Sequence, residues 1–243
     1  SILSYNGVDF SSVYYEADGV IYQKVLPIID YKGTQINMNE TYVIPYDKNA
    51  IIKICNDNGA SELGSDIINF LNGKVNGTTK DSYLIDYMKK TYDKTTNKAV
   101  GLVLDKVLED SFTTMGCREV SDYAIMSAMV ATNSFVKFNY GTGADNYSKG
   151  FTSVAAAQGG LQCDPFIIWC YSQGIYATNK NITTSDQVKS IIHSNINPEF
   201  CYSADGKFKS FNGDLSSIKD GSVLYKGNTF HVGMVIGHAK VNG

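Results

Sequence analysis

The chain has 243 residues, of which 43% are hydrophobic and 19% are charged, as is usual for a soluble globular protein. The formal net charge is -3 and the basic residues form no cluster, which argues against a nucleic-acid partner. No apolar run approaches the roughly 18 residues that cross a membrane, so no membrane span is predicted.

The first part of the chain, residues 1–58, is predicted to form strands. Its apolar and polar residues alternate, and the dipeptides Asp-Gly at 18–19 and Lys-Gly at 32–33 suit two-residue hairpin turns. Pro27 and Pro45 favour edge strands or strand ends, because proline cannot donate a hydrogen bond to a neighbouring strand.

The next part, residues 61–136, is predicted to form helices, because its apolar residues recur at spacings of three and four. Ser61 or Ser65 is expected to cap a helix that stops at residues 72–73. Ser121 is expected to cap the last helix of this part. The other predicted helices lie at 80–93 and 98–115.

The sequence changes character after residue 138, where a glycine-rich stretch begins. A polar loop is expected over about 177–212. Two strands joined by a turn at 226–228 are predicted near the end of the chain.

Two parts are therefore expected, and together they predict an α+β fold. Residues 1–118 form a region of unknown function, with strands at about 1–58 and helices at about 61–116. Residues 119–243 form a second domain, which carries the candidate chemistry described next.

One cysteine stands at a position that favours reactivity. Asp164 is a favourable N-cap and Pro165 a favourable first helical residue, so Cys163 is predicted to lie just before a helix that stops at Gly174. Free N–H groups and the dipole at a helix start stabilise a thiolate, which is the competent nucleophile. Cys170, further along the same helix, is expected to be a small buried side chain.

His231 is the matching candidate for a general base. It is predicted to open a strand, HVGMVIG, whose glycines leave room for close approach of another group. A cysteine at a helix start, followed later by a histidine at a strand start, is also the order in papain-like enzymes. The sequence has three histidines and no CxxC pair, so no metal site is expected.

Three stretches resemble the NlpC/P60 family of cysteine peptidases. Residues 163–175, CDPFIIWCYSQGI, resemble the D-C-S-G-F motif that carries the nucleophile. Residues 218–237, IKDGSVLYKGNTFHVGMVIG, resemble the second motif, in which a strand precedes H-V-G. Residues 138–143, FNYGTG, resemble the tyrosine-containing stretch that leads into the cysteine. The resemblance covers roughly residues 121–243.

The resemblance implies a papain-like fold, in which the helix that carries the cysteine packs on a small antiparallel sheet that carries the histidine. It implies that Cys163 attacks a carbonyl carbon to form an acyl-enzyme, while His231 accepts the thiol proton and later protonates the leaving amine. The implied substrates are amide bonds in the stem peptides of bacterial peptidoglycan, and the implied location is extracellular or at the cell wall. No cofactor is implied.

The residues around the cysteine depart from the family motif. Gln162 stands where the family has Asp, Asp164 where it has Ser, and Pro165 where it has Gly. Asp164 could receive the amine of a substrate, but its charge would oppose a neighbouring thiolate. Gln162 and Asp164, together with Tyr140 and Trp169, are the expected substrate contacts.

A third catalytic residue is expected about a dozen residues after the histidine in this family. The chain stops near that point, at the turn-forming Asn-Gly of 242–243, which leaves a continuation beyond the sequence open. Asn242 and His238 are the candidates for orienting the imidazole, with His193 more distant. An enzyme that works with the Cys–His pair alone is the other option.

Three classes of function stay open at this point. The first is a peptidoglycan hydrolase, and the second is a related CHAP-type, transglutaminase-like or protein-directed cysteine hydrolase. The third is a catalytically degenerate binding or structural module, such as a part of a phage tail or a surface protein. A larger assembly and an immunity or inhibitor protein are possible partners.

The composition also bears on the source. Arg118 is the sole arginine among 21 basic residues, a bias that favours a low-GC bacterial genome. The chain begins SILSYNG, which leaves a removed signal peptide open.

Overall fold

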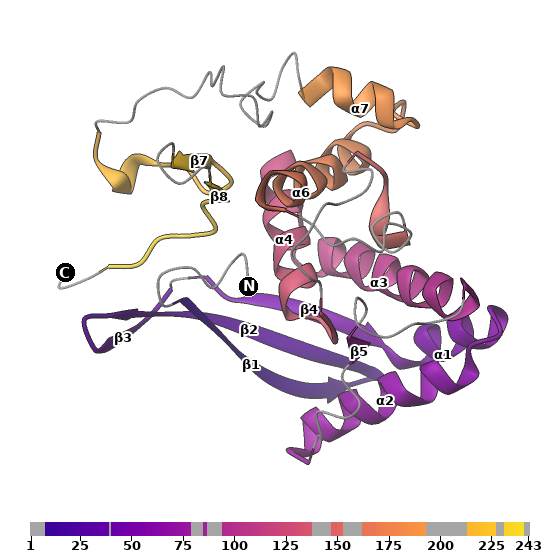
Figure 1. Cartoon of the computed structure of the whole chain (residues 1–243). Helices are drawn as coiled ribbons and strands as arrows, with labels where there is room; N and C mark the ends of the chain where they lie inside the picture. The colour runs from indigo at the N-terminus through magenta and orange to yellow at the C-terminus, as the bar shows by residue number, and fades with distance from the viewer. Residues whose placement is uncertain are drawn as a thin grey trace.

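The computed structural model confirms the predicted α+β class. A four-stranded antiparallel sheet comes first, helices follow, and a two-stranded antiparallel hairpin lies near the C-terminus (Figure 1). The structure describes residues 8–38, 40–78, 85–86, 94–137, 147–152, 162–192, 213–226 and 231–240.

The N-terminal sheet has β2 at its centre. Its strands are β1 (Val8–Ala17), β2 (Val20–Tyr31), β3 (Thr34–Asn37) and β4 (Tyr42–Asp47). β2 pairs with β1 on one side and with β3 and β4 on the other. The predicted turns at 18–19 and 32–33 are confirmed, because all four residues have positive φ, between 51° and 82°, as tight hairpin turns require.

The two prolines of the sheet have different outcomes. Pro45 lies on β4, which pairs only with β2 among the described strands, so its edge position is confirmed. The same prediction is wrong for Pro27, which lies on the central strand. Pro27 falls between the last β4 partner and the first β3 partner of β2, and its carbonyl accepts from Met38 N at 2.9 Å. The lack of an N–H on Pro27 is tolerated because the residue falls at this junction between the two partner strands of β2.

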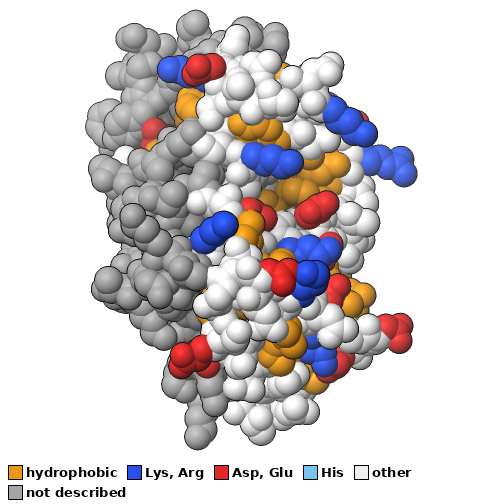
Figure 2. All heavy atoms as spheres, turned by 90° about the vertical axis from the view of Figure 1, so that its right-hand side faces the viewer, with side chains coloured by type: hydrophobic (Ala, Val, Ile, Leu, Met, Phe, Trp, Pro, Cys, Tyr) orange, Lys and Arg blue, Asp and Glu red, His pale blue; other side chains and the backbone are white. Residues whose placement is uncertain are grey.

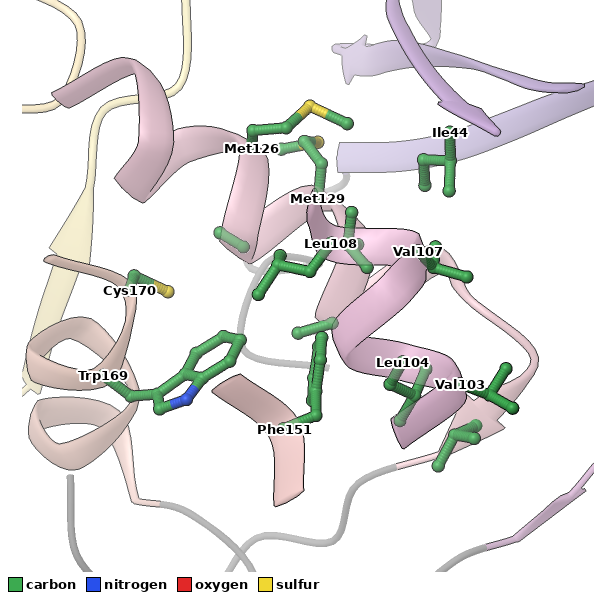
Figure 3. Close-up of a cluster of buried hydrophobic side chains, with 14 of the residues drawn as sticks. Ile44, Val103, Leu104, Val107, Leu108, Met126, Met129, Phe151, Trp169 and Cys170 are labelled. Carbon is green, nitrogen blue, oxygen red and sulfur yellow. The ribbon is translucent and has the colours of Figure 1, made fainter. Parts of the chain in front are cut away.

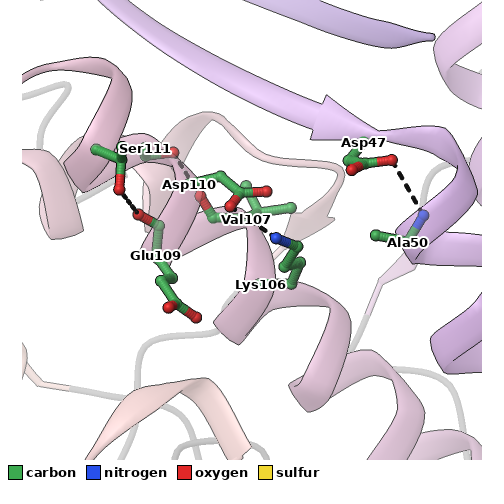
Figure 4. A network of polar contacts seen from close by, with 8 residues as sticks. Asp47, Ala50, Lys106, Val107, Glu109, Asp110 and Ser111 are labelled. Atoms are coloured by element: carbon green, nitrogen blue, oxygen red, sulfur yellow. Dashed lines mark hydrogen bonds and ion pairs between the residues drawn. The ribbon is translucent and has the colours of Figure 1, made fainter.

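The strand predicted to run through residue 58 ends earlier, because residues 48–57 form helix α1 (Lys48–Asp57). The Asp47 carboxylate caps this helix by accepting from Ala50 N at 3.1 Å (Figure 4). Ile51 and Cys55, one turn apart, are buried, so a helical face was available in a segment that also alternates like a strand.

Two glycines do not end the helices that they were predicted to end. Helix α2 (Ser61–Asn76) passes through Gly73 and stops before Gly77, which has a φ of 67°. Helix α6 (Cys163–Thr178) passes through Gly174. A Cβ on Gly174 would lie 2.6 Å from the Val120 carbonyl oxygen, so this glycine lets α6 approach the start of α4 closely.

The middle helices are partly as predicted. Helix α3 (Lys94–Thr114) ends before Gly116, as expected. Helix α4 (Val120–Asn133) is capped by Glu119, which forms a capping box with Asp122, so Ser121 is not the cap. Within the predicted helix 80–93 the structure describes two residues, and they form a strand. This strand, β5 (Ile85–Asp86), pairs in parallel with β6 (Val136–Lys137).

The C-terminal part holds the predicted hairpin and one helix that was not predicted. Strands β7 (Val223–Lys226) and β8 (His231–Met234) pair antiparallel, and their connecting turn lies outside the described residues. Helix α7 (Ser185–Ile191) lies within the stretch predicted to be a polar loop. Its capping box, formed by Thr184 and Gln187, was the signal for it in the sequence.

Helices α3, α4 and α6 meet β4 in one cluster of buried side chains (Figure 3). The cluster holds residues from both sides of position 118; the division into two domains at that position stays a prediction. A buried polar contact also joins the sheet to α4. Gln23, 2% exposed, donates to the Asn133 carbonyl oxygen at 3.0 Å and accepts from the Tyr46 hydroxyl at 2.6 Å.

The surface is mixed in charge where Figure 2 shows it. Basic and acidic side chains are interspersed on this face, with apolar side chains between them. Lys106 and Asp110 on α3, for example, form an ion pair at 2.8 Å (Figure 4). Among the helices of the described ranges, none is long and apolar enough to cross a membrane.

Candidate functional site

Cys163 is the first residue of α6. The helix starts slightly earlier than predicted, because Gln162, not Asp164, occupies the N-cap position, and its side chain makes no capping hydrogen bond. Phe166 N donates to the Gln162 carbonyl oxygen at 3.1 Å. Pro165 falls on the third helical residue, where the missing N–H has no partner to lose. The Cys163 thiol is free and its residue is 3% exposed.

His231 is the first residue of β8, as predicted, and it is half-buried. It pairs in register with Lys226 at the turn end of the hairpin. α6 packs on β8 (Figure 1). The two candidate residues therefore begin two elements that are in contact with each other.

Asp164 follows Cys163 in the first turn of α6. Its Oδ1 atom is buried and has no hydrogen-bond partner within the described part of the chain. Burial raises the pKa of Asp164 above its ordinary value, because a charge is poorly solvated there.

Trp169 and Cys170, on the same helix, lie in the core and are fully buried. The Trp169 indole N–H donates to the Gly150 carbonyl oxygen at 3.2 Å, and its ring lies 4.8 Å from that of Phe151. Burial raises the pKa of Cys170 well above its ordinary value, which agrees with the structural role expected for this thiol.

Of the remaining predicted site residues, the structure describes only His238. His238 lies beyond the end of β8, and its Nδ1 atom is 3.0 Å from Asp220 Oδ1. Tyr140, Asn242 and His193 lie outside the described residues. Within those residues, no group of three or more His, Cys, Asp and Glu side chains is arranged to hold a metal ion.

One half-buried carboxyl group in this region was not singled out from the sequence. Asp105, on α3, accepts from Phe151 N, so it holds the short helical segment at 150–152. From α6, Gln173 Oε1 accepts from Gly150 N at 2.7 Å. An aspartate within a helical pattern is usually solvent-facing, and the sequence carries no signal for this long-range contact.

Asp105→Asn is expected to stabilise the protein at neutral pH. Burial raises the pKa of Asp105 from 3.8 to about 6, against opposing hydrogen bonds from Phe151 and Thr152. The folded state therefore holds this proton more tightly than the unfolded state, and stability falls as pH rises from about 4 to about 6. The pKa shift corresponds to about 3 kcal/mol in the free energy of unfolding. The wild-type protein should have lost this stability by pH 7, whereas the asparagine variant should keep it.

Urea unfolding of both proteins at pH 4 and pH 7 measures this difference. Asp110→Asn, on the same helix, is the control, because Asp110 forms a partly exposed ion pair with Lys106. The Asp110→Asn substitution should change the free energy of unfolding by less than about 1 kcal/mol. A wild-type protein as stable as the Asp105→Asn variant at pH 7 would contradict the buried-charge argument.

Comparison of the chain with protein-family models, with curated proteins and with solved structures finds no match.

Proposed function

We propose that the protein is a cysteine hydrolase that cleaves amide bonds in the stem peptides of bacterial peptidoglycan, with Cys163 as nucleophile and His231 as base. The finer description of the fold, a papain-like domain of the NlpC/P60 kind, is part of the same proposal. One observation carries it: the helix that Cys163 begins packs on the strand that His231 begins. Extracellular or cell-wall location follows from such a substrate.

The contact between α6 and β8 can be located along both elements. The Tyr171 hydroxyl lies 3.6 Å from the Cβ position of Gly221, and Gly221 N donates to the Val235 carbonyl oxygen at 2.7 Å. α6 therefore passes the end of β8 near Tyr171. From Cys163 to Tyr171 the helix rises about 12 Å, and from His231 to Val235 the strand spans about 13 Å.

The chemistry is acyl transfer. The Cys163 thiolate attacks the carbonyl carbon of the amide, and the amine leaves with a proton from His231. Water then hydrolyses the thioester, with His231 as the base. The developing oxyanion needs N–H donors. Pro165 has no N–H, Phe166 N already donates to Gln162, and Asp164 N interacts with its own carboxylate. Cys163 N is therefore the proposed donor of the first turn.

Digestion of purified peptidoglycan tests the proposal. The wild-type protein should release new free amines and shorter stem peptides, read by mass spectrometry, while Cys163→Ala should release none. Identical products from the two proteins would reject the proposed function. Release of fragments from a protein substrate, with peptidoglycan left intact, would instead favour a protein-directed cysteine hydrolase.

The 3% exposure of Cys163 favours a second candidate, a non-catalytic module of the same fold. A nucleophile has to reach its substrate, and a thiol that stays covered cannot. Alkylation by iodoacetamide separates the two candidates. An enzyme should label at Cys163 in the folded state near neutral pH, faster than the thiols of the unfolded chain, whereas a non-catalytic module should protect this thiol until it unfolds.

A further inference from the structure

The segment that follows β8 runs over the N-terminal sheet (Figure 1) and contacts the N-terminal part of the chain at Ile236 and Gly237. The Tyr42 hydroxyl, on β4, donates to the Ile236 carbonyl oxygen at 2.5 Å. Next along the segment, a Cβ on Gly237 would lie 2.8 Å from the Met38 Cε atom. The end of the Met38 side chain therefore lies directly over Gly237.

The same segment is continuous with the hairpin that carries His231. Val235 N donates to the Ser222 carbonyl oxygen at 2.9 Å, and Gly221 N donates to the Val235 carbonyl oxygen at 2.7 Å. These bonds extend the β7–β8 ladder from its Val223–Met234 end. A contact that fixes Ile236 therefore also restrains strand β8, at a point five residues after His231.

Tyr42 is suited to be a fixed donor. Its residue is 5% exposed, and its hydroxyl has one proton to share between Ile236 and the Glu40 carboxylate, which is farther away at 3.2 Å. Burial, together with Glu40 and Asp220, raises the pKa of Tyr42 far above its ordinary value. The hydroxyl consequently keeps its proton over the whole range in which a hydrolase works.

We propose that Tyr42 is a positioning residue that holds the β7–β8 hairpin, and with it the imidazole of His231, against the N-terminal sheet. This inference rests on the proposed function. It gives residues 1–118 a role in the reaction, because the domain that carries Cys163 and His231 would depend on strand β4 for the placement of its base.

Tyr42→Phe tests the proposal, with Tyr46→Phe as the matched control. Both tyrosines lie on β4, both are buried, and each loses one hydroxyl hydrogen bond, but that of Tyr46 goes to Gln23 and not to the C-terminal segment. We expect Tyr42→Phe to lower kcat about tenfold with KM unchanged, since one net hydrogen bond is of that size. Tyr46→Phe should leave both constants near wild type.

Two further measurements do not depend on activity. Amide hydrogen exchange at residues 232–236 should quicken about tenfold in Tyr42→Phe but not in Tyr46→Phe, and the imidazole NMR signals of His231 should shift in the first variant alone. If Tyr42→Phe does not fold, slow exchange of these amides in the wild-type protein still supports the contact, and exchange as fast as in an unstructured peptide overturns it.

The outcomes separate this inference from the proposed function. Unchanged exchange and unchanged His231 signals in Tyr42→Phe overturn the positioning role, even in an active enzyme. Equal changes in both tyrosine variants overturn it too, because they would report general loosening. A selective change in Tyr42→Phe supports the hold on the hairpin, and wild-type protein that releases nothing from peptidoglycan would then reject the proposed function alone.

Discussion

His231→Ala is expected to slow peptidoglycan hydrolysis by about 10²–10⁴-fold, the usual contribution of a positioned general acid–base group. The imidazole would accept the Cys163 proton and return it to the leaving amine, and no other described histidine lies on β8. Release of new amines under single-turnover conditions measures the chemical step directly.

His238→Ala is the matched control for this variant. His238 comes from the same C-terminal part of the chain, but its Nδ1 atom faces Asp220. We expect the rate of hydrolysis to fall by less than about tenfold, because this variant removes only the contact with Asp220. A greater loss for His238→Ala than for His231→Ala would exchange the roles of the two histidines and refute the proposed base.

Trp169→Ala is expected to lower the free energy of unfolding by about 3–5 kcal/mol, as is typical of a large buried aromatic side chain. Trp169 is 0% exposed and packs between Phe151 and Phe166. Removal of the ring also removes the hydrogen bond from the indole N–H to the Gly150 carbonyl oxygen. Figure 3 shows this ring at the centre of the contact between α6 and its neighbours.

Chemical denaturation of the wild type and two comparison variants measures the effect. Trp169→Phe keeps most of the ring and should lose about 1–2 kcal/mol, mainly the hydrogen bond. Ile52→Ala changes an apolar residue that is 41% exposed and should cost less than about 1 kcal/mol. A loss below about 1 kcal/mol for Trp169→Ala would mean that the core around α6 rearranges to fill the space.

The parts of the fold that could be predicted are those that local chemistry decides. The turns at 18–19 and 32–33 need positive φ, which Gly and Asp or Lys supply there. The strand that His231 opens is marked by simple alternation. Helix α1 could not be predicted from its pattern alone, because its run of apolar residues suits either state until the cap at Asp47 is weighed.

The glycines show why helix ends were harder to predict. Gly77 and Gly116 end helices with positive φ, whereas Gly174 lies inside a helix because the Val120 backbone passes too close for a side chain. A glycine that ends a helix and a glycine that permits packing have the same letter in the sequence. Tertiary contact distinguishes them, and one sequence does not reveal it.

In the candidate site, too, local features could be predicted from the sequence, whereas tertiary contacts could not. A helix start close to Cys163 could be predicted, although Gln162 and not Asp164 is its N-cap, and the strand at His231 follows from periodicity. Three contacts join residues that are distant along the chain: the packing of α6 on β8, the bond from Phe151 N to Asp105, and the bond from Tyr42 to Ile236. Spacing in the sequence carries no signal for contacts of that kind.

The bond between Tyr42 and Ile236 joins residues 194 positions apart, which has a consequence for synthesis of the protein. The sheet leaves the ribosome early and can form first, whereas its hold on the hairpin has to wait until Ile236 has emerged. Closing so long a loop is entropically costly and slow. If the hairpin carries the catalytic base, a nascent chain stays inactive until nearly all of this sequence has been translated, which would protect the producing cell from its own hydrolase during synthesis.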